Sequence, residues 1–129
     1  MTDAATLPVL VVDDYATMVR IMRKLLKQIG FEDVDEAASG AEAMDKIKAR
    51  KYGLIISDWN MEPMTGLDLL KAVRAEPAMA TTPFILVTAE SKADNVIAAR
   101  NAGANDYLIK PFSGPALKEK IDKALAARA

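Results

Sequence analysis

The chain has 129 residues, the length of one compact domain, and 51% of them are hydrophobic, enough for one buried core. The formal net charge of −1 excludes the broad basic footprint of a nucleic-acid-binding protein. The absence of cysteine and histidine excludes disulfides, thiolate metal sites and histidine-based catalysis. We expect a single domain over residues 1–129, without an output domain.

The N-terminal residues lack the basic region and long apolar run of a signal peptide. No apolar run approaches the ~20 residues that a membrane-spanning helix needs. We therefore expect a monomeric cytoplasmic protein that neither inserts into membranes nor binds nucleic acid.

The predicted elements alternate between buried strands and amphipathic helices from the start of the chain. Val9–Val12 is an unbroken apolar run, which predicts a strand buried on both faces of a parallel sheet. A helix follows and ends at Gly30, a residue suited to the left-handed conformation after a helix. The apolar stripe of that helix is predicted to contain Met18, Ile21, Leu25, Leu26 and Ile29. Val34–Ala37 predicts an edge strand, because its Asp35 and Glu36 require a solvated side.

The same alternation continues through the rest of the chain. Ser113 is predicted to cap the last helix, with Pro115 in its first turn, and Gly103 is predicted to close the helix before it. Five strands alternating with helices predict an α/β fold with a doubly wound parallel sheet. The remaining strands are predicted at 54–56, 84–87 and 107–109, and the remaining helices around 43–47, 67–73, 96–100 and 117–125.

Polar residues follow four of the predicted strands at the point where each strand ends. They are Asp13-Asp14, Ser57-Asp58, Thr88-Ala89 and Lys110-Pro111. Each pair alone has an ordinary role as a helix cap, a turn or a solvated charge. In a parallel sheet, however, these ends share one rim, and ligand sites lie outside the carboxyl ends of the strands.

Three carboxylates on one rim repel each other, and a single lysine supplies only one positive charge. A divalent metal ion would supply the remaining positive charge. A site with only oxygen ligands and open coordination positions suits Mg²⁺ best. A carboxylate beside Mg²⁺ and an ammonium group is arranged for phosphoryl transfer to aspartate, which forms an acyl phosphate.

Four segments carry a resemblance to the response-regulator receiver family, and the likeness extends over nearly the whole chain, from about Val9 to Leu125. Within that family the chain is most similar to the single-domain chemotaxis regulators. The resemblance implies the flavodoxin-like strand order 2-1-3-4-5 with five helices. The four segments are Val11-Val12-Asp13-Asp14, Ile56-Ser57-Asp58-Trp59-Asn60-Met61, Val87-Thr88-Ala89-Glu90 and Tyr107-Leu108-Ile109-Lys110-Pro111-Phe112.

The resemblance implies a role for each residue of the site. Asp58 would accept the phosphoryl group. Mg²⁺ would be bound directly by Asp14, Asp58 and the backbone carbonyl of Asn60. Asp13 would act through a metal-bound water. Lys110 would pair with the phosphoryl group. Two further features are implied: a hydrogen bond from Thr88 to the phosphoryl group, and a cis peptide before Pro111.

The chain departs from the family pattern in two places. After Met61 it reads Glu62-Pro63-Met64-Thr65, so the proline comes one place late and Thr65 stands where the family often has an acid. The path of this loop, and the distance of Glu62 from the metal, stay open. Ala93 also stands where the chemotaxis regulators have a lysine on their partner surface.

A switch is predicted beyond the site. Thr88 would move toward the phosphoryl group, and the ring of Tyr107 would fill the space that it leaves. Val96, Tyr107 and Lys120 would then form the face that binds a partner. Reciprocal coupling between phosphorylation and partner binding follows from such a two-state element.

The resemblance implies a histidine kinase as phosphodonor, with a flagellar motor switch protein and a phosphatase as further partners. Signalling in chemotaxis is the main hypothesis, and a phosphate sink or relay intermediate is the alternative. We do not expect a turnover enzyme. A phosphatase with a nucleophilic aspartate needs a second acid two residues later, where this chain has Asn60. A flavodoxin-like protein is disfavoured because carboxylates on the rim would repel the FMN phosphate.

Overall fold

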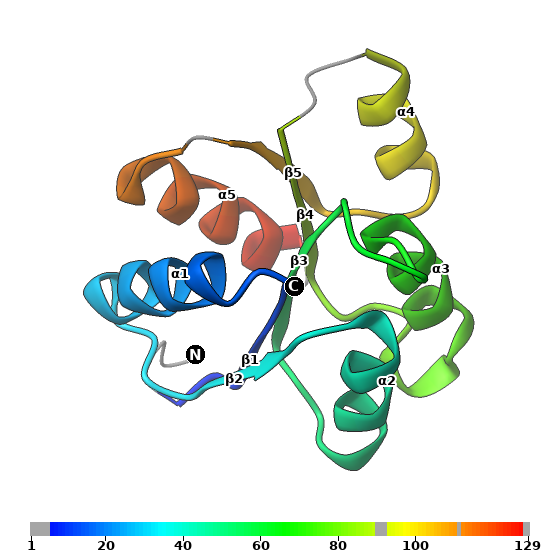
Figure 1. Ribbon diagram of the computed structural model, residues 1–129, viewed down its shortest axis with the longest axis horizontal. Coiled ribbons are helices and arrows are strands. Elements are labelled where there is room, and N and C mark those ends of the chain that lie inside the picture. Colours follow the sequence, from blue (N-terminus) through cyan, green and yellow to red (C-terminus); the bar gives the residue numbers. More distant parts are fainter. Residues whose placement is uncertain (1–5, 90–92, 111, 128–129) are drawn as a thin grey trace.

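The computed structural model describes residues 6–89, 93–110 and 112–127. Within them five strands alternate with five α-helices, and a short 3₁₀ helix, η1, precedes the fourth strand (Figure 1). The elements are β1 (Val9–Val12), α1 (Ala16–Ile29), β2 (Val34–Ala37), α2 (Gly40–Ala49), β3 (Leu54–Asp58), α3 (Gly66–Ala75), η1 (Pro77–Met79), β4 (Phe84–Thr88), α4 (Ala93–Asn101), β5 (Asp106–Ile109) and α5 (Gly114–Ala127).

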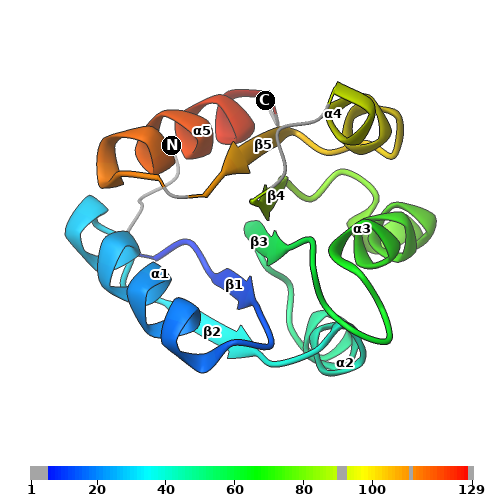
Figure 2. The same ribbon diagram turned by 45° about the horizontal axis from the view of Figure 1, so that its top comes forward.

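The strands form one parallel sheet in the order β2-β1-β3-β4-β5. Helices α1 and α5 cover one face, while α2, α3 and α4 cover the other (Figure 2). This confirms the predicted doubly wound α/β fold. The chain reverses its winding direction between β1 and β3, so the ends of these two strands flank the topological switch point.

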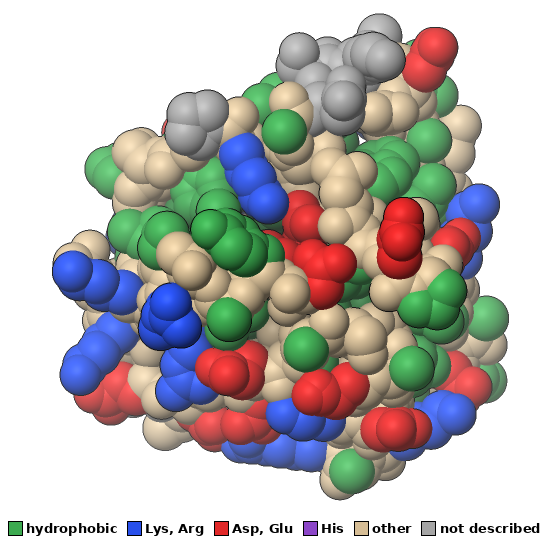
Figure 3. Space-filling view, viewed as in Figure 1, with side chains coloured by type: hydrophobic (Ala, Val, Ile, Leu, Met, Phe, Trp, Pro, Cys, Tyr) green, Lys and Arg blue, Asp and Glu red, His purple; other side chains and the backbone are tan. Residues whose placement is uncertain are grey.

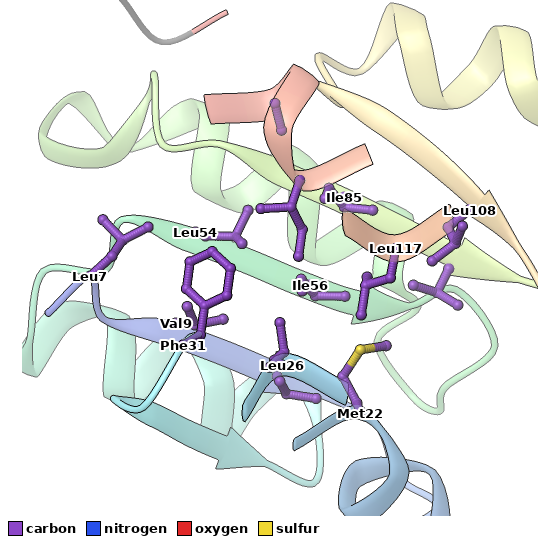
Figure 4. Close-up of a cluster of buried hydrophobic side chains, with 14 of the residues drawn as sticks. Leu7, Val9, Met22, Leu26, Phe31, Leu54, Ile56, Ile85, Leu108 and Leu117 are labelled. Carbon is purple, nitrogen blue, oxygen red and sulfur yellow. The ribbon is translucent and has the colours of Figure 1, made fainter. Parts of the chain in front are cut away.

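Two apolar clusters hold the helices against the sheet, because successive strand residues point to opposite faces. The cluster that faces α1 and α5 includes Val9, Val11, Leu54 and Ile56. Figure 4 shows Val9, Leu54 and Ile56 of this cluster beside Leu26, Phe31 and Leu117. The residues between them face α2, α3 and α4. The second cluster is centred on Leu10, Val12, Ile55, Phe84 and Leu86.

The predicted stripe of α1 is wrong in part. Ile21 is 45% exposed, whereas Val19 and Met22 are buried together with Leu26. Apolar residues occur on several sides of this helix, so their spacing alone does not select the face that packs. The contacts with the sheet and with α5 select it. On α4, Ile97 is likewise 54% exposed.

The predicted helix ends are confirmed where the structure describes them. Gly30 adopts the left-handed conformation with φ 119°, and its N–H donates to the carbonyls of Leu26 and Lys27. Ser113 Oγ accepts a hydrogen bond from the Ala116 N–H at 3.2 Å at the start of α5. No helix in the described part of the chain is both long enough and apolar enough to cross a membrane.

Candidate functional site

The switch point carries a group of three carboxylates. Asp13 and Asp14 follow β1 directly, and Asp58 ends β3. Each offers an oxygen that lies within 4.8 Å of the others. Asp13 and Asp58 are only 4% and 6% exposed, whereas Asp14 is open to solvent. Figure 3 shows acidic side chains gathered near the middle of this face, with a basic side chain next to them.

The carboxylate of Asp13 is held in an environment that disfavours its charge. Burial raises its pKa to about 6, and the nearby charge of Asp58 acts in the same direction. A hydrogen bond from the Tyr15 N–H to Asp13 Oδ1, at 3.0 Å, opposes the shift, as does the charge of Lys110. The group therefore concentrates negative charge in a place with little water to screen it.

Lys110 brings an ammonium group to this cluster from the end of β5. Its Nζ lies 2.9 Å from Asp58 Oδ1 and 3.8 Å from Asp13 Oδ2. The Lys110 N–H donates to the Thr88 carbonyl at 2.7 Å, which ties the end of β5 to the end of β4. Thr88 itself is 1% exposed. The ends of β1, β3, β4 and β5 thus place the predicted site residues on one rim.

The donor set fits a hard divalent cation. Asp58 Oδ1 is buried and accepts no hydrogen bond from the described residues, so its charge is balanced only by the Lys110 ammonium group. Three clustered carboxylates offer oxygen ligands alone, and Asp14 leaves the cluster open to water and phosphate. This combination matches Mg²⁺, which binds through few carboxylates and keeps open positions.

The loop after β3 explains how the chain accommodates its departures from the family pattern. Thr65 forms a capping box with Asp68, in which each side chain accepts the backbone N–H of the other, at 3.1 and 3.2 Å. Thr65 therefore caps the start of α3, a role that the sequence analysis did not assign. Glu62 is exposed and not part of the carboxylate group, and the Glu62–Pro63 peptide is cis.

This loop also returns close to Asp58. The Gly66 N–H donates to the Trp59 carbonyl at 3.0 Å, and a Cβ atom at Gly66 would lie 2.2 Å from the Asp58 carbonyl oxygen. Any larger residue would force the loop away from the proposed acceptor. Asn60 lies in this exposed turn directly after Trp59, and its role as a carbonyl ligand stays a prediction.

Comparison with known proteins decides the family. The family model for the response regulator receiver domain matches residues 9–122 of this chain. The chain belongs to this family. It is 45% identical over 115 residues to the chemotaxis protein CheY of Pseudomonas aeruginosa, covering 89% of this chain and 93% of that relative. It is 43% identical to CheY-3 of Vibrio cholerae, covering 89% and 88%. A crystallised CheY4 of Vibrio cholerae superimposes with a TM-score of 0.87 at 34% identity, covering 94% of this chain and 100% of that one.

The residues predicted to form the partner face of this receiver domain meet in a second place. Val96, Tyr107 and Lys120 all line a groove of about 320 Å³ between α4, β5 and α5. The ring of Tyr107 also contacts Trp59 edge to face, with centroids 6.3 Å apart and planes at 84°. Tyr107 therefore lies between the groove and the residue that follows Asp58.

Lys120 Nζ pairs with Asp106 Oδ1 at 3.2 Å, and its role on a partner-binding face stays a prediction. Asp106 was missed by the sequence analysis, where it was only the residue before a predicted strand. The expected cis peptide before Pro111 lies outside the described residues.

Proposed function

We propose that this receiver domain is switched by Mg²⁺-dependent phosphorylation of Asp58. The observation that carries the proposal is the buried Asp58 carboxylate, with Oδ1 2.9 Å from Lys110 Nζ and two further carboxylates beside it. Family membership supports the same assignment.

The reaction transfers one phosphoryl group. An Asp58 oxygen attacks the phosphorus of a phosphohistidine on a histidine kinase, the new P–O bond forms, and the P–N bond to imidazole breaks. Lys110 lies where its charge would neutralise phosphoryl oxygens in the transition state. Asp14, Asp58 and the Asn60 carbonyl would hold Mg²⁺, with Asp13 acting through water. The bound ion would supply positive charge for the same oxygens.

The proposed output is partner binding in chemotaxis, with a flagellar motor switch protein as partner and a phosphatase to reset the switch. Two similar relatives carry the name of chemotaxis proteins, which supports this output. Tyr107 lines the groove together with Val96 and Lys120, and Thr88 ends the neighbouring strand β4 at the rim. The protein acts as a phosphoryl acceptor and not as a turnover enzyme, because Asn60 offers no acid–base group beside Asp58.

The first test is phosphorylation by acetyl phosphate with Mg²⁺, followed by intact-mass spectrometry. We expect the mass of one added phosphoryl group on the wild type and almost none on Asp58→Asn. Asp45→Asn is the matched control, because Asp45 is exposed on α2 and should leave labelling unchanged. Equal labelling of Asp58→Asn and wild type would refute the assignment.

The second test follows Mg²⁺ through the fluorescence of Trp59, the only tryptophan, which comes directly after Asp58. Mg²⁺ should change the wild-type emission, and Asp14→Ala should remove most of the response because a direct carboxylate ligand is lost. Asp45→Ala serves as the control. No response of the wild type up to tens of millimolar Mg²⁺, roughly the weak end for an open oxygen site, would contradict the metal assignment.

A further inference from the structure

Helix α1 carries four cations and no acidic residue. Arg20, Arg23, Lys24 and Lys27 are all exposed, and Figure 3 shows basic side chains gathered on the left over α1. They are spaced by three or four residues, so each faces another cation along the helix, an arrangement that destabilises an isolated helix. The stability of α1 by itself therefore does not account for this pattern.

Helix α5 on the same face of the sheet shows the opposite arrangement. Lys118 pairs with Asp122 at 2.8 Å, and Lys123 pairs with Glu119 at 3.3 Å, both one helical turn apart. Of the α1 cations, only Arg23 forms an ion pair within the described part of the chain, with Glu36 of β2 at 3.0 Å. Lys24 and Lys27 have no ion-pair partner among the described residues, so their charges are available to a ligand.

The cations of α1 border a groove. This groove lies between α1 and the start of β2 and has a volume of about 460 Å³. It is lined by Arg23, Lys24 and Lys27 together with Phe31, Glu32 and Val34. Phe31 is only 3% exposed, so the groove has an apolar floor beneath its charged wall. The groove lies beside the outer edge of β2, which pairs with β1 alone within the described chain.

We propose that this α1–β2 groove docks a short acidic segment of a partner protein. Carboxylates of such a segment would reach Lys24 and Lys27 while its apolar side chains contact the floor. The surroundings favour a short protein segment over a nucleic acid or an anionic membrane. The groove wall offers two cations without an ion-pair partner among the described residues, Lys24 and Lys27, beside the carboxylate of Glu32. An extended polyanion gains its affinity from many neutralised phosphates, so such a small number of free cations suits a short segment better.

The groove is separate from both surfaces of the proposed phosphorylation switch. It shares no lining residue with the carboxylate cluster or with the groove at Val96, Tyr107 and Lys120. A ligand that interacts equally with two states cannot shift their equilibrium. Docking here is therefore independent of phosphorylation, and it holds a partner near the receiver domain in both states.

The test measures binding of a fluorescently labelled oligoglutamate peptide by anisotropy on the intact protein. Reversing both free charges with Lys24→Glu plus Lys27→Glu should weaken binding about tenfold, because attraction is replaced by repulsion. The matched control is Lys118→Glu plus Lys123→Glu on α5, which changes the net charge equally and should have little effect. Beryllofluoride with Mg²⁺, which mimics the phosphorylated state, should leave the affinity within about twofold.

One further variant and two further probes complete the experiment. Lys24→Gln plus Lys27→Gln, with wild-type circular dichroism, should also weaken binding, which separates charge from folding. Equal binding by the reversed variant and the α5 control would overturn the proposal. Tighter binding of oligothymidylate or of anionic vesicles would overturn it in favour of another polyanion. A large effect of beryllofluoride would overturn the independence from phosphorylation, whereas failure of Asp58 phosphorylation would leave the docking result standing.

Discussion

The two ends of the sheet treat buried polar groups in opposite ways. At the carboxyl end, Asp13 and Asp58 are buried beside each other with one ammonium group for both. At the amino end, buried and half-buried polar groups have specific partners. Arg74 of α3 donates to the Thr82 carbonyl, the Gly103 carbonyl and Asn105 Oδ1, at 2.7, 3.0 and 2.9 Å.

A second network at the amino end shows the same completeness. The hydroxyl of Tyr52, before β3, donates to Asp35 Oδ2 of β2 at 2.7 Å, and Arg50 pairs with Asp35 and Asp33. The guanidinium group of Arg50 also lies over the Tyr52 ring, 5.6 Å from its centroid. The contrast indicates that the amino end holds the strands together, whereas the carboxyl end keeps unbalanced charge for a ligand.

The largest effect on stability is expected at Arg74. Arg74→Met removes the donor from three acceptors that join α3 to the starts of β4 and β5, and it should lower the free energy of unfolding by about 2–3 kcal/mol. Urea denaturation followed by circular dichroism measures this. Lys71→Met on the same helix is the control, since Lys71 is exposed, and it should change stability by less than about 0.5 kcal/mol. Equal effects of the two variants would show that Arg74 does not hold these segments together.

A smaller loss is expected for Tyr52→Phe, because the variant leaves the ring in place and removes one hydrogen bond. Stability should fall by about 1 kcal/mol near neutral pH, measured by thermal unfolding. Tyr15→Phe is the control, since Tyr15 is 62% exposed. A variant as stable as the wild type would mean that water replaces the bond without cost.

The stabilisation by Tyr52 should also depend on pH in a defined way. The hydrogen bond from the Tyr52 hydroxyl holds the pKa of Asp35 below its ordinary value of 3.8. The stabilisation from this bond is therefore fully present above pH 3.8, and it is lost as the pH falls through the lowered pKa of Asp35. Burial, together with Asp35, raises the pKa of Tyr52 from 10.0 to about 12, so its contribution is present below pH 10 and is lost as pH rises through about 12. The difference between wild type and Tyr52→Phe should therefore shrink at both extremes, and a constant difference would contradict the network.

The smallest effect, and the one with the opposite sign, is expected at the carboxyl end. Asp13→Asn removes a buried charge that Asp58 repels, while its amide oxygen can still accept the Tyr15 N–H. Without Mg²⁺ the variant should gain about 0.5–1 kcal/mol of stability. The control is Asp45→Asn on the exposed face of α2. A loss of stability in Asp13→Asn would mean that the carboxylate cluster supports the fold, and the contrast between the two ends would fail.

Much of the fold and of the candidate site was predictable from the chain alone. Apolar runs and helical spacing predict the strands and helices because these patterns are local, and the strands begin or end within a residue or two of the predicted limits. The residues Asp13, Asp14, Asp58 and Lys110 could be placed together because parallel strands bring their carboxyl ends to one rim.

Other features depend on contacts between segments that are distant in the chain, and only the tertiary structure decides them. The face of α1 that packs, the partners of Arg74 and the pair of Lys120 with Asp106 are of this kind. So is the buried Asp58 oxygen that accepts no hydrogen bond from the described residues. A sequence pattern shows which residues are apolar or charged, but burial and pairing depend on the distance and direction of side chains that folding brings together.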